Sequence, residues 1–142
     1  MQQVYVSAII DAPLETVWKV LRDFNALPAW HPLVAASLIE ENLPADAIGC
    51  IRNFQLNGSG ETIREQLLAL SDIEHFCTYS ILEAPLHVSD YVATVRLRPI
   101  TTTGQTFGEW QSKFNTPLGE EVSVCEAVRG IYEDGFASIA KR

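Results

Sequence analysis

The chain has 142 residues, of which 47% are hydrophobic and 20% are charged, proportions typical of one globular domain spanning residues 1–142. Its net charge of −8 argues against nucleic acid as a partner, and no apolar run approaches the roughly 20 residues of a membrane-spanning helix. The cysteines are too scattered for a disulfide framework or a zinc site, and the amino terminus lacks the basic segment of a secretory signal, so we predict a cytoplasmic protein.

The first part of the chain alternates between strand and helix signals. Asp11 and Pro13 are typical of a helix start, because an aspartate can cap the first turn and a proline is tolerated within it. Apolar residues then recur at helical spacing as far as Phe24. The expected elements are a strand, a helix, a short helical turn and an edge strand, over Gln3–Ile10, Leu14–Phe24, Asn25–Pro32 and Leu33–Glu41.

A hairpin over Ile48–Leu70 is the most informative stretch of the sequence. Two β-rich runs flank the turn formers Asn57–Gly60. Because strand side chains alternate between faces, this loop places Arg52 opposite Glu65 on one face, together with Cys50, Phe54, Ile63 and Leu67. An ion pair on an apolar face is either a structural tie between two strands or a polar anchor inside a cavity, and both readings stay open.

Three more strands are expected downstream, over Phe76–Leu82, Asp90–Arg98 and Thr106–Phe114. Turn residues in Thr101–Gly104 join the last two of them. Their apolar face pairs Tyr91 with Phe114, Ala93 with Ser112, Val95 with Trp110, and Leu97 with Gly108. On the other face Arg96 lies opposite Glu109, which predicts a surface ion pair of little energetic weight.

A long helix over Leu118–Ala140 closes the chain. Its expected apolar stripe consists of Leu118, Val122, Cys125, Val128, Tyr132, Phe136 and Ile139. Gly130 and Gly135 lower helix propensity, so they mark either a close approach or a bend. The whole order predicts an α+β fold, in which a single antiparallel sheet of about seven strands is covered on its apolar face by this helix.

Five segments carry a resemblance to a known superfamily: IDAPLETVWKVLRDFNALPAWHP, GCIRNFQL, ETIREQLLALSD, FCTYSILEAPL and FGEWQSKF. In these segments the chain resembles the START-like, Bet v 1-like (SRPBCC) superfamily, and within it the polyketide cyclase/dehydrase-like group of small bacterial proteins. The resemblance covers essentially the whole chain. It implies the helix-grip fold, with a curved sheet around the long C-terminal helix, two short helices after the first strand, and an apolar cavity between sheet and helix. No strict catalytic motif accompanies it.

The residues expected to line such a cavity are aromatic or charged: Trp30, Arg52, Phe54, Glu65, Tyr79, Tyr91 and Trp110. The Arg52 guanidinium would hold a ligand's carboxylate, phosphate or enolate, with Glu65 fixing it in place. Tyr79 and Tyr91 are expected contacts because a buried hydroxyl needs a partner. For each aromatic residue taken alone, plain core packing is the competing explanation.

The candidates for catalysis are His31, Arg52 and Glu65. His31 follows Trp30 in a proline-broken loop, where it would act as a general base or cap backbone groups. His75 and His87 are far from it in the sequence, so no metal site and no cofactor is predicted.

Three functions remain open at this point. The first is a binding module for a small hydrophobic or aromatic, polyketide- or lipid-like molecule. The second is a cyclase, dehydratase or isomerase acting on a polyketide-like substrate without metal. The third is an interaction protein with no small-molecule ligand. We expect a monomer or a homodimer in each case.

Overall fold

The computed structural model describes residues 1–141, which form one antiparallel sheet and three α-helices. The strands are β1 (Gln2–Ile10), β2 (Val34–Ile39), β3 (Ile51–Leu56), β4 (Thr62–Ser71), β5 (Phe76–Glu83), β6 (Ser89–Ile100) and β7 (Gln105–Asn115). The helices are α1 (Leu14–Leu21), α2 (Leu27–Trp30) and α3 (Glu121–Ile139), with a short 3₁₀ turn η1 (Glu40–Asn42) after β2. None of the helices found in the described residues is both long and apolar enough to cross a bilayer.

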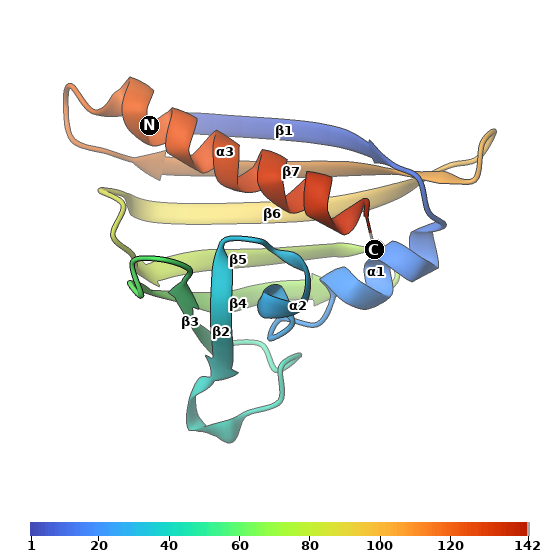
Figure 1. The fold of residues 1–142 in the computed structure, drawn as a ribbon, viewed down its shortest axis with the longest axis horizontal. Helices are drawn as coiled ribbons and strands as arrows, with labels where there is room; N and C mark the ends of the chain where they lie inside the picture. Colours follow the sequence, from blue (N-terminus) through green and yellow to red (C-terminus); the bar gives the residue numbers. More distant parts are fainter. Residues whose placement is uncertain (142) are drawn as a thin grey trace.

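The seven strands follow the order β1-β7-β6-β5-β4-β3-β2, and the whole arrangement is the α+β helix-grip fold that the resemblance implies. Figure 1 shows α3 lying across β1, β7 and β6, whereas β2 and β3 turn steeply away from the direction of these strands. The register of β4 shifts against β5 between Arg64 and Glu65 and again between Leu67 and Ala69. Such irregularities bend a strand and increase its local twist.

The predicted strand registers are confirmed except at the start of β6, where a register shift between Ser89 and Val92 interrupts the ladder at the predicted pair of Tyr91 and Phe114. In the β3–β4 hairpin Arg52 pairs with Glu65 and Phe54 with Ile63, and in the β6–β7 hairpin Val95 pairs with Trp110. Gly58 and Gly60 in the first loop adopt positive φ angles, which only glycine takes without strain. Turn chemistry and strand alternation therefore set both registers independently of the rest of the fold.

Two expectations about the first helix are wrong. Asp11 does not cap it, because the N-cap is Pro13 and no side chain caps the first turn. The helix ends at Leu21, and Phe24 lies beyond it although its side chain is buried. The Asp23 carboxylate accepts a hydrogen bond from the Asn25 N–H at 3.0 Å, and a local bond of this kind competes with continued helix.

The apolar stripe of α3 differs from the prediction at its amino-terminal end. Leu118 precedes the helix and is 96% exposed, and Val122 is 72% exposed. The buried residues are Val124, Val128, Tyr132, Gly135, Phe136 and Ile139. Steps of four residues back from Tyr132 reach Val124, whereas the two-residue step from Val124 to Val122 turns about 200° around the axis. The prediction that Val122 belongs to the buried stripe is therefore wrong, because the helix packs a different side against the sheet.

The expected surface pair between Arg96 and Glu109 is also wrong, although the two residues face each other across β6 and β7. Glu109 instead accepts a hydrogen bond from the Tyr5 hydroxyl at 2.7 Å and lies 3.8 Å from Arg98 Nε. The Arg96 guanidinium lies 4.6 Å from the centre of the Phe76 ring. Glu109 thus interacts with the diagonal cation Arg98, and Arg96 interacts with the ring of Phe76, in place of the predicted pair between Arg96 and Glu109.

The two glycines of α3 provide a matched test of how closely the helix approaches the sheet. Replacing Gly130 by alanine is expected to raise the free energy of unfolding by up to about 1 kcal/mol, because alanine favours the helix and the new Cβ would meet no atom within 4 Å. Replacing Gly135 by alanine is expected to lower it, since the Cβ would lie 2.8 Å from Trp110 Cζ3 and 3.2 Å from His31 Cδ2. Chemical denaturation of both variants measures the difference, and equal effects at the two positions would contradict this packing.

Candidate functional site

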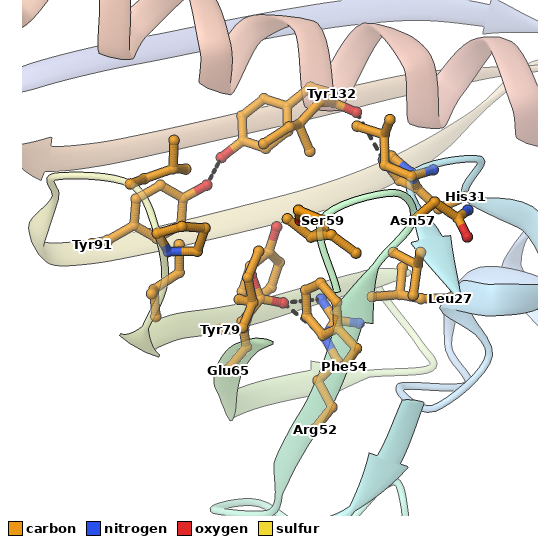
Figure 2. A pocket seen from close by; sticks show the side chains of 18 of the residues that line it. Leu27, His31, Arg52, Phe54, Asn57, Ser59, Glu65, Tyr79, Tyr91 and Tyr132 are labelled. Atoms are coloured by element: carbon orange, nitrogen blue, oxygen red, sulfur yellow. Dashed lines mark hydrogen bonds and ion pairs between the residues drawn. The ribbon is translucent and has the colours of Figure 1, made fainter. Parts of the chain in front are cut away.

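A cavity of about 200 Å³ lies between the sheet, α2 and α3. Figure 2 shows Tyr132 entering it from α3, while Arg52, Phe54, Glu65, Tyr79 and Tyr91 enter from the sheet. Its remaining walls are Leu27, His31, Leu33, Val34, Leu56, Asn57, Ser59, Ile63, Ile81, Pro85, Leu86, Trp110 and Ile131. Leu33, Asn57, Ser59 and Pro85 are exposed, so the mouth lies between the loop before β2 and the β3–β4 and β5–β6 loops.

The Arg52–Glu65 pair lies in the cavity wall, on the face that the hairpin register predicts. Arg52 Nε donates to Glu65 Oε1 at 2.8 Å, and Arg52 Nη2 lies 2.7 Å from the same oxygen. Arg52 Nη1 donates to the carbonyl oxygen of Phe24 at 3.3 Å. Both side chains are only 8% exposed, so this is a buried, hydrogen-bonded ion pair.

Aromatic rings surround the Arg52 guanidinium. Its central carbon lies 3.9 Å from the ring centre of Phe24, 4.9 Å from that of Tyr79 and 5.8 Å from that of Phe54. The negative faces of such rings attract a cation, and the attraction is stronger where water is excluded. Burial raises the pKa of Glu65, and the positive charge of Arg52 opposes that rise.

Tyr79 and Trp110 are held together in the inner wall of the cavity. Trp110 Nε1 donates a hydrogen bond to the Tyr79 hydroxyl oxygen at 3.0 Å. The Trp110 ring stacks on that of Tyr132 with centres 4.6 Å apart and an interplanar angle of 12°. Burial raises the pKa of Tyr79 well above its usual value, so its hydroxyl keeps its proton at neutral pH.

Tyr91 and Tyr132 share a hydrogen bond between their hydroxyl groups, which links β6 to α3 across the cavity. Burial is the main cause that raises the pKa of both phenols, so both are neutral at physiological pH. The sequence interpretation placed Tyr132 on the apolar stripe of the last helix but did not include it among the ligand contacts. Its position in that stripe, facing the sheet, was the signal that could have placed it in the cavity.

His31 lines the cavity, and both of its ring nitrogens bond to the backbone. Nδ1 accepts from the Leu33 N–H at 3.2 Å, which places the proton on Nε2, where it is donated to the Ile131 carbonyl at 3.0 Å. Burial lowers the pKa of His31 below its usual value, consistent with this neutral tautomer. A general base needs a lone pair that faces its substrate, whereas this imidazole ties the loop before β2 to α3.

Trp30 lies outside the cavity, in contrast to the prediction that it contacts a ligand. Its ring is buried against Trp110, with centres 6.4 Å apart, and its carbonyl accepts a hydrogen bond from Ser138 of α3. Leu27, in α2, and His31, the residue that follows this helix, line the cavity instead. The side chains of consecutive residues here point in different directions. A prediction that treated Trp30 and His31 as one motif could not tell which of the two lines the cavity.

No three His, Cys, Asp or Glu side chains within residues 1–141 cluster closely enough to hold a metal ion. The cavity offers one buried ion pair and three protonated phenols, on walls that are otherwise mostly apolar except for His31, Asn57 and Ser59. This set can pack against an apolar molecule and exchange a few hydrogen bonds with it.

Comparisons with known proteins agree with this architecture. Residues 1–142 match the family described as polyketide cyclase / dehydrase and lipid transport. An uncharacterized protein from Bacillus thuringiensis is 31% identical, with a TM-score of 0.88 over 99% of this chain and 97% of that chain. The protein XoxI from Bacillus cereus is 30% identical (TM-score 0.89; 99% and 94% covered), and a protein from Nitrosospira multiformis is 29% identical (TM-score 0.86; 99% and 94% covered). The chain thus belongs to the polyketide cyclase / dehydrase and lipid transport family, as the match over its whole length shows.

Proposed function

We propose that this protein binds a small hydrophobic or aromatic molecule in the cavity beneath α3. The observation that carries the proposal is the cavity itself, a space of about 200 Å³ whose walls are mostly aliphatic and aromatic. An apolar cavity of about 150 Å³ stays dry and takes up benzene, so this one has room for a substituted ring. Pockets for drug-sized ligands measure about 300–1,000 Å³, so this cavity suits a smaller molecule.

The packing of the inner wall supports a site that is formed before its ligand arrives. Trp110 is fixed by its stacking on Tyr132 and its hydrogen bond to Tyr79, and Arg52 is fixed by three polar contacts. A wall held in this way loses little further freedom when a ligand binds, which favours affinity. The family match supports ligand binding in general and leaves the ligand unnamed.

A second candidate is an enzyme of the cyclase, dehydratase or isomerase type acting on such a molecule. One observation favours it: a carboxyl group and three protonated phenols, all potential proton donors or acceptors, line the same cavity. Native mass spectrometry of the protein from its own host separates the two candidates. A bound molecule that is released unchanged after incubation supports binding alone, and conversion to a product supports the enzyme.

Filling the mouth of the cavity is expected to weaken binding. In Leu86→Trp the larger side chain would occupy the entrance, so the dissociation constant of ethylbenzene should rise by about tenfold or more. Isothermal titration calorimetry and the ligand-induced rise in Tm both measure this.

The matched control is Leu82→Trp, the same exchange four residues earlier, near the end of β5, at a residue that is 46% exposed and does not line the cavity. It should bind ethylbenzene like the parent. If the parent protein shows no binding of ethylbenzene or of related small aromatic molecules, the proposed function is wrong.

A further inference from the structure

We propose that the cavity selects a neutral ligand that carries a hydroxyl group, bound by Glu65 Oε2 and the Tyr79 hydroxyl, and that it discriminates against carboxylates. This inference rests on the proposed function and specifies the chemistry of the ligand. It reverses the sequence-based expectation that the Arg52 guanidinium receives an anion.

Each of the three guanidinium nitrogens of Arg52 already contacts an oxygen of the protein. Two of its nitrogens contact Glu65 Oε1 and the third donates to the Phe24 carbonyl, while aromatic rings lie within 5 Å of its central carbon on Phe24 and Tyr79. An incoming carboxylate would have to displace Glu65 or approach it closely. Two carboxylates sharing one guanidinium in a buried site repel each other, so an anionic ligand is disfavoured.

Glu65 Oε2, in contrast, is a free acceptor. Both contacts from Arg52 go to Oε1, and none of the described residues donates a hydrogen bond to Oε2. Glu65 lines the cavity, and its side chain is 8% exposed. An acceptor that faces an apolar space favours a ligand that brings a hydrogen-bond donor.

The Tyr79 hydroxyl supplies the complementary donor. Its oxygen accepts from Trp110 Nε1, and none of the described residues accepts its hydrogen. Glu65 and Tyr79 are diagonal neighbours on the adjacent strands β4 and β5, where Glu65 pairs with Ile81 and Tyr79 with Leu67. Figure 2 shows both side chains entering the cavity. A ligand hydroxyl can donate to Glu65 Oε2 while it accepts from Tyr79, which a hydrocarbon, an ether or a carboxylate cannot do.

The location of these two groups also orients the ligand. Glu65 and Tyr79 are buried, whereas the residues around the mouth, such as Leu33 and Pro85, are exposed. The hydroxyl therefore enters first, and the apolar remainder of the ligand packs against Ile63, Ile81 and Leu86 toward the mouth. A para-alkylated phenol has this distribution of polar and apolar surface.

The test compares three probes that share an ethylphenyl group by isothermal titration calorimetry at neutral pH: 4-ethylphenol, ethylbenzene and 4-ethylbenzoate. We expect 4-ethylphenol to bind about tenfold or more tightly than ethylbenzene, because a hydrogen bond to a charged acceptor is among the stronger kinds. We expect 4-ethylbenzoate to bind more weakly than ethylbenzene. Tightest binding of the benzoate, or equal affinities of phenol and hydrocarbon, would overturn this inference and leave the proposed function standing. If no probe binds, the proposed function fails and this inference fails with it.

Two variants test whether Glu65 and Tyr79 cause the preference for 4-ethylphenol over ethylbenzene. In Arg52→Met/Glu65→Leu, which removes both charges together, the ratio of the ethylbenzene and 4-ethylphenol dissociation constants should fall to near one. Tyr79→Phe, which keeps the ring, should lower the same ratio and serves if the double variant does not fold by circular dichroism. If the ratio stays at the parent value in these variants, other hydroxyls such as those of Tyr91 and Tyr132 cause the preference, and the assignment of ligand binding to Glu65 and Tyr79 is wrong.

The matched control for the double variant is Glu40→Leu/Arg64→Met. Arg64 precedes Glu65 on β4 and forms an ion pair with Glu40 through contacts of 2.7 and 2.9 Å, but neither residue lines the cavity. The ratio of the two dissociation constants should stay at the parent value. A fall in this control equal to that in Arg52→Met/Glu65→Leu would show that a general loss of stability, rather than Glu65, changes the preference.

Discussion

Replacing either Arg52 by methionine or Glu65 by leucine is expected to lower the free energy of unfolding by about 3–5 kcal/mol, because each change leaves a buried charge without its partner. The double variant Arg52→Met/Glu65→Leu should recover much of this loss, since it removes both desolvated charges and keeps apolar volume. Urea denaturation of the parent, the two single variants and the double variant measures the coupling. If the loss of unfolding free energy in the double variant equals the sum of the losses in the two single variants, the result would contradict a buried ion pair.

The pH dependence of the Arg52→Met variant has a defined sign. Burial already raises the pKa of Glu65, and loss of the Arg52 charge removes the effect that opposes the rise. An acid whose pKa is higher in the folded than in the unfolded state loses stability as the pH rises through the folded pKa. Relative to the parent, Arg52→Met should therefore be destabilised less in mild acid than at neutral pH. The half-buried pair of Arg64 and Glu40 provides the comparison, because its side chains are 31% and 24% exposed, so the loss of one partner leaves the other in contact with water and should cost less.

Phe136→Ala is expected to lower the free energy of unfolding by about 3–5 kcal/mol. Phe136 is buried and does not line the cavity. Its ring packs edge to face against that of Trp110, with the ring centres 5.5 Å apart. Its ring therefore has protein on all sides, and its removal leaves a hole that the surroundings fill only in part. Thermal and urea denaturation measure the loss. Val122→Ala on the same helix is the control, and its effect should be small because Val122 is 72% exposed.

A double-mutant cycle with Gly108 identifies the surface against which this ring packs. A Cβ at Gly108 would lie 2.8 Å from Phe136 Cε1, so Gly108→Ala should destabilise the parent protein. In the Phe136→Ala background the same change should cost much less, since the methyl group then enters the space that the ring has left. Independent effects of the two substitutions would contradict the packing of α3 directly on β7.

The sheet could be predicted from the sequence because the patterns that specify its strands and hairpins lie within short segments. In the β3–β4 hairpin, turn residues at Asn57–Gly60 and the alternation of side chains specify that Arg52 opposes Glu65, whatever lies above the sheet. The same reasoning paired Val95 with Trp110. The helix-grip arrangement came from the resemblance, and the family match and the structure both confirm it.

The lining of the cavity could be predicted from the sequence only in part. Arg52, Phe54, Glu65, Tyr79, Tyr91 and Trp110 line it because the strand faces that carry them were assigned correctly. Trp30 lies outside because the one-turn helix α2 turns it toward Trp110, and a turn that short has too few residues for periodicity to reveal its buried side.

The sequence by itself determined the strands, their registers and the face on which the ion pair lies, because each of these depends on residues close together in the chain and on the two-residue period of a strand. Tertiary structure alone decided where α3 begins and which of its sides meets the sheet, so that Val124 is buried and Val122 is not. It also decided that the Arg52 donors meet Glu65 Oε1 and the Phe24 carbonyl while Glu65 Oε2 stays free. These outcomes depend on how side chains from distant segments fill a common space, and no pattern within one segment encodes that packing.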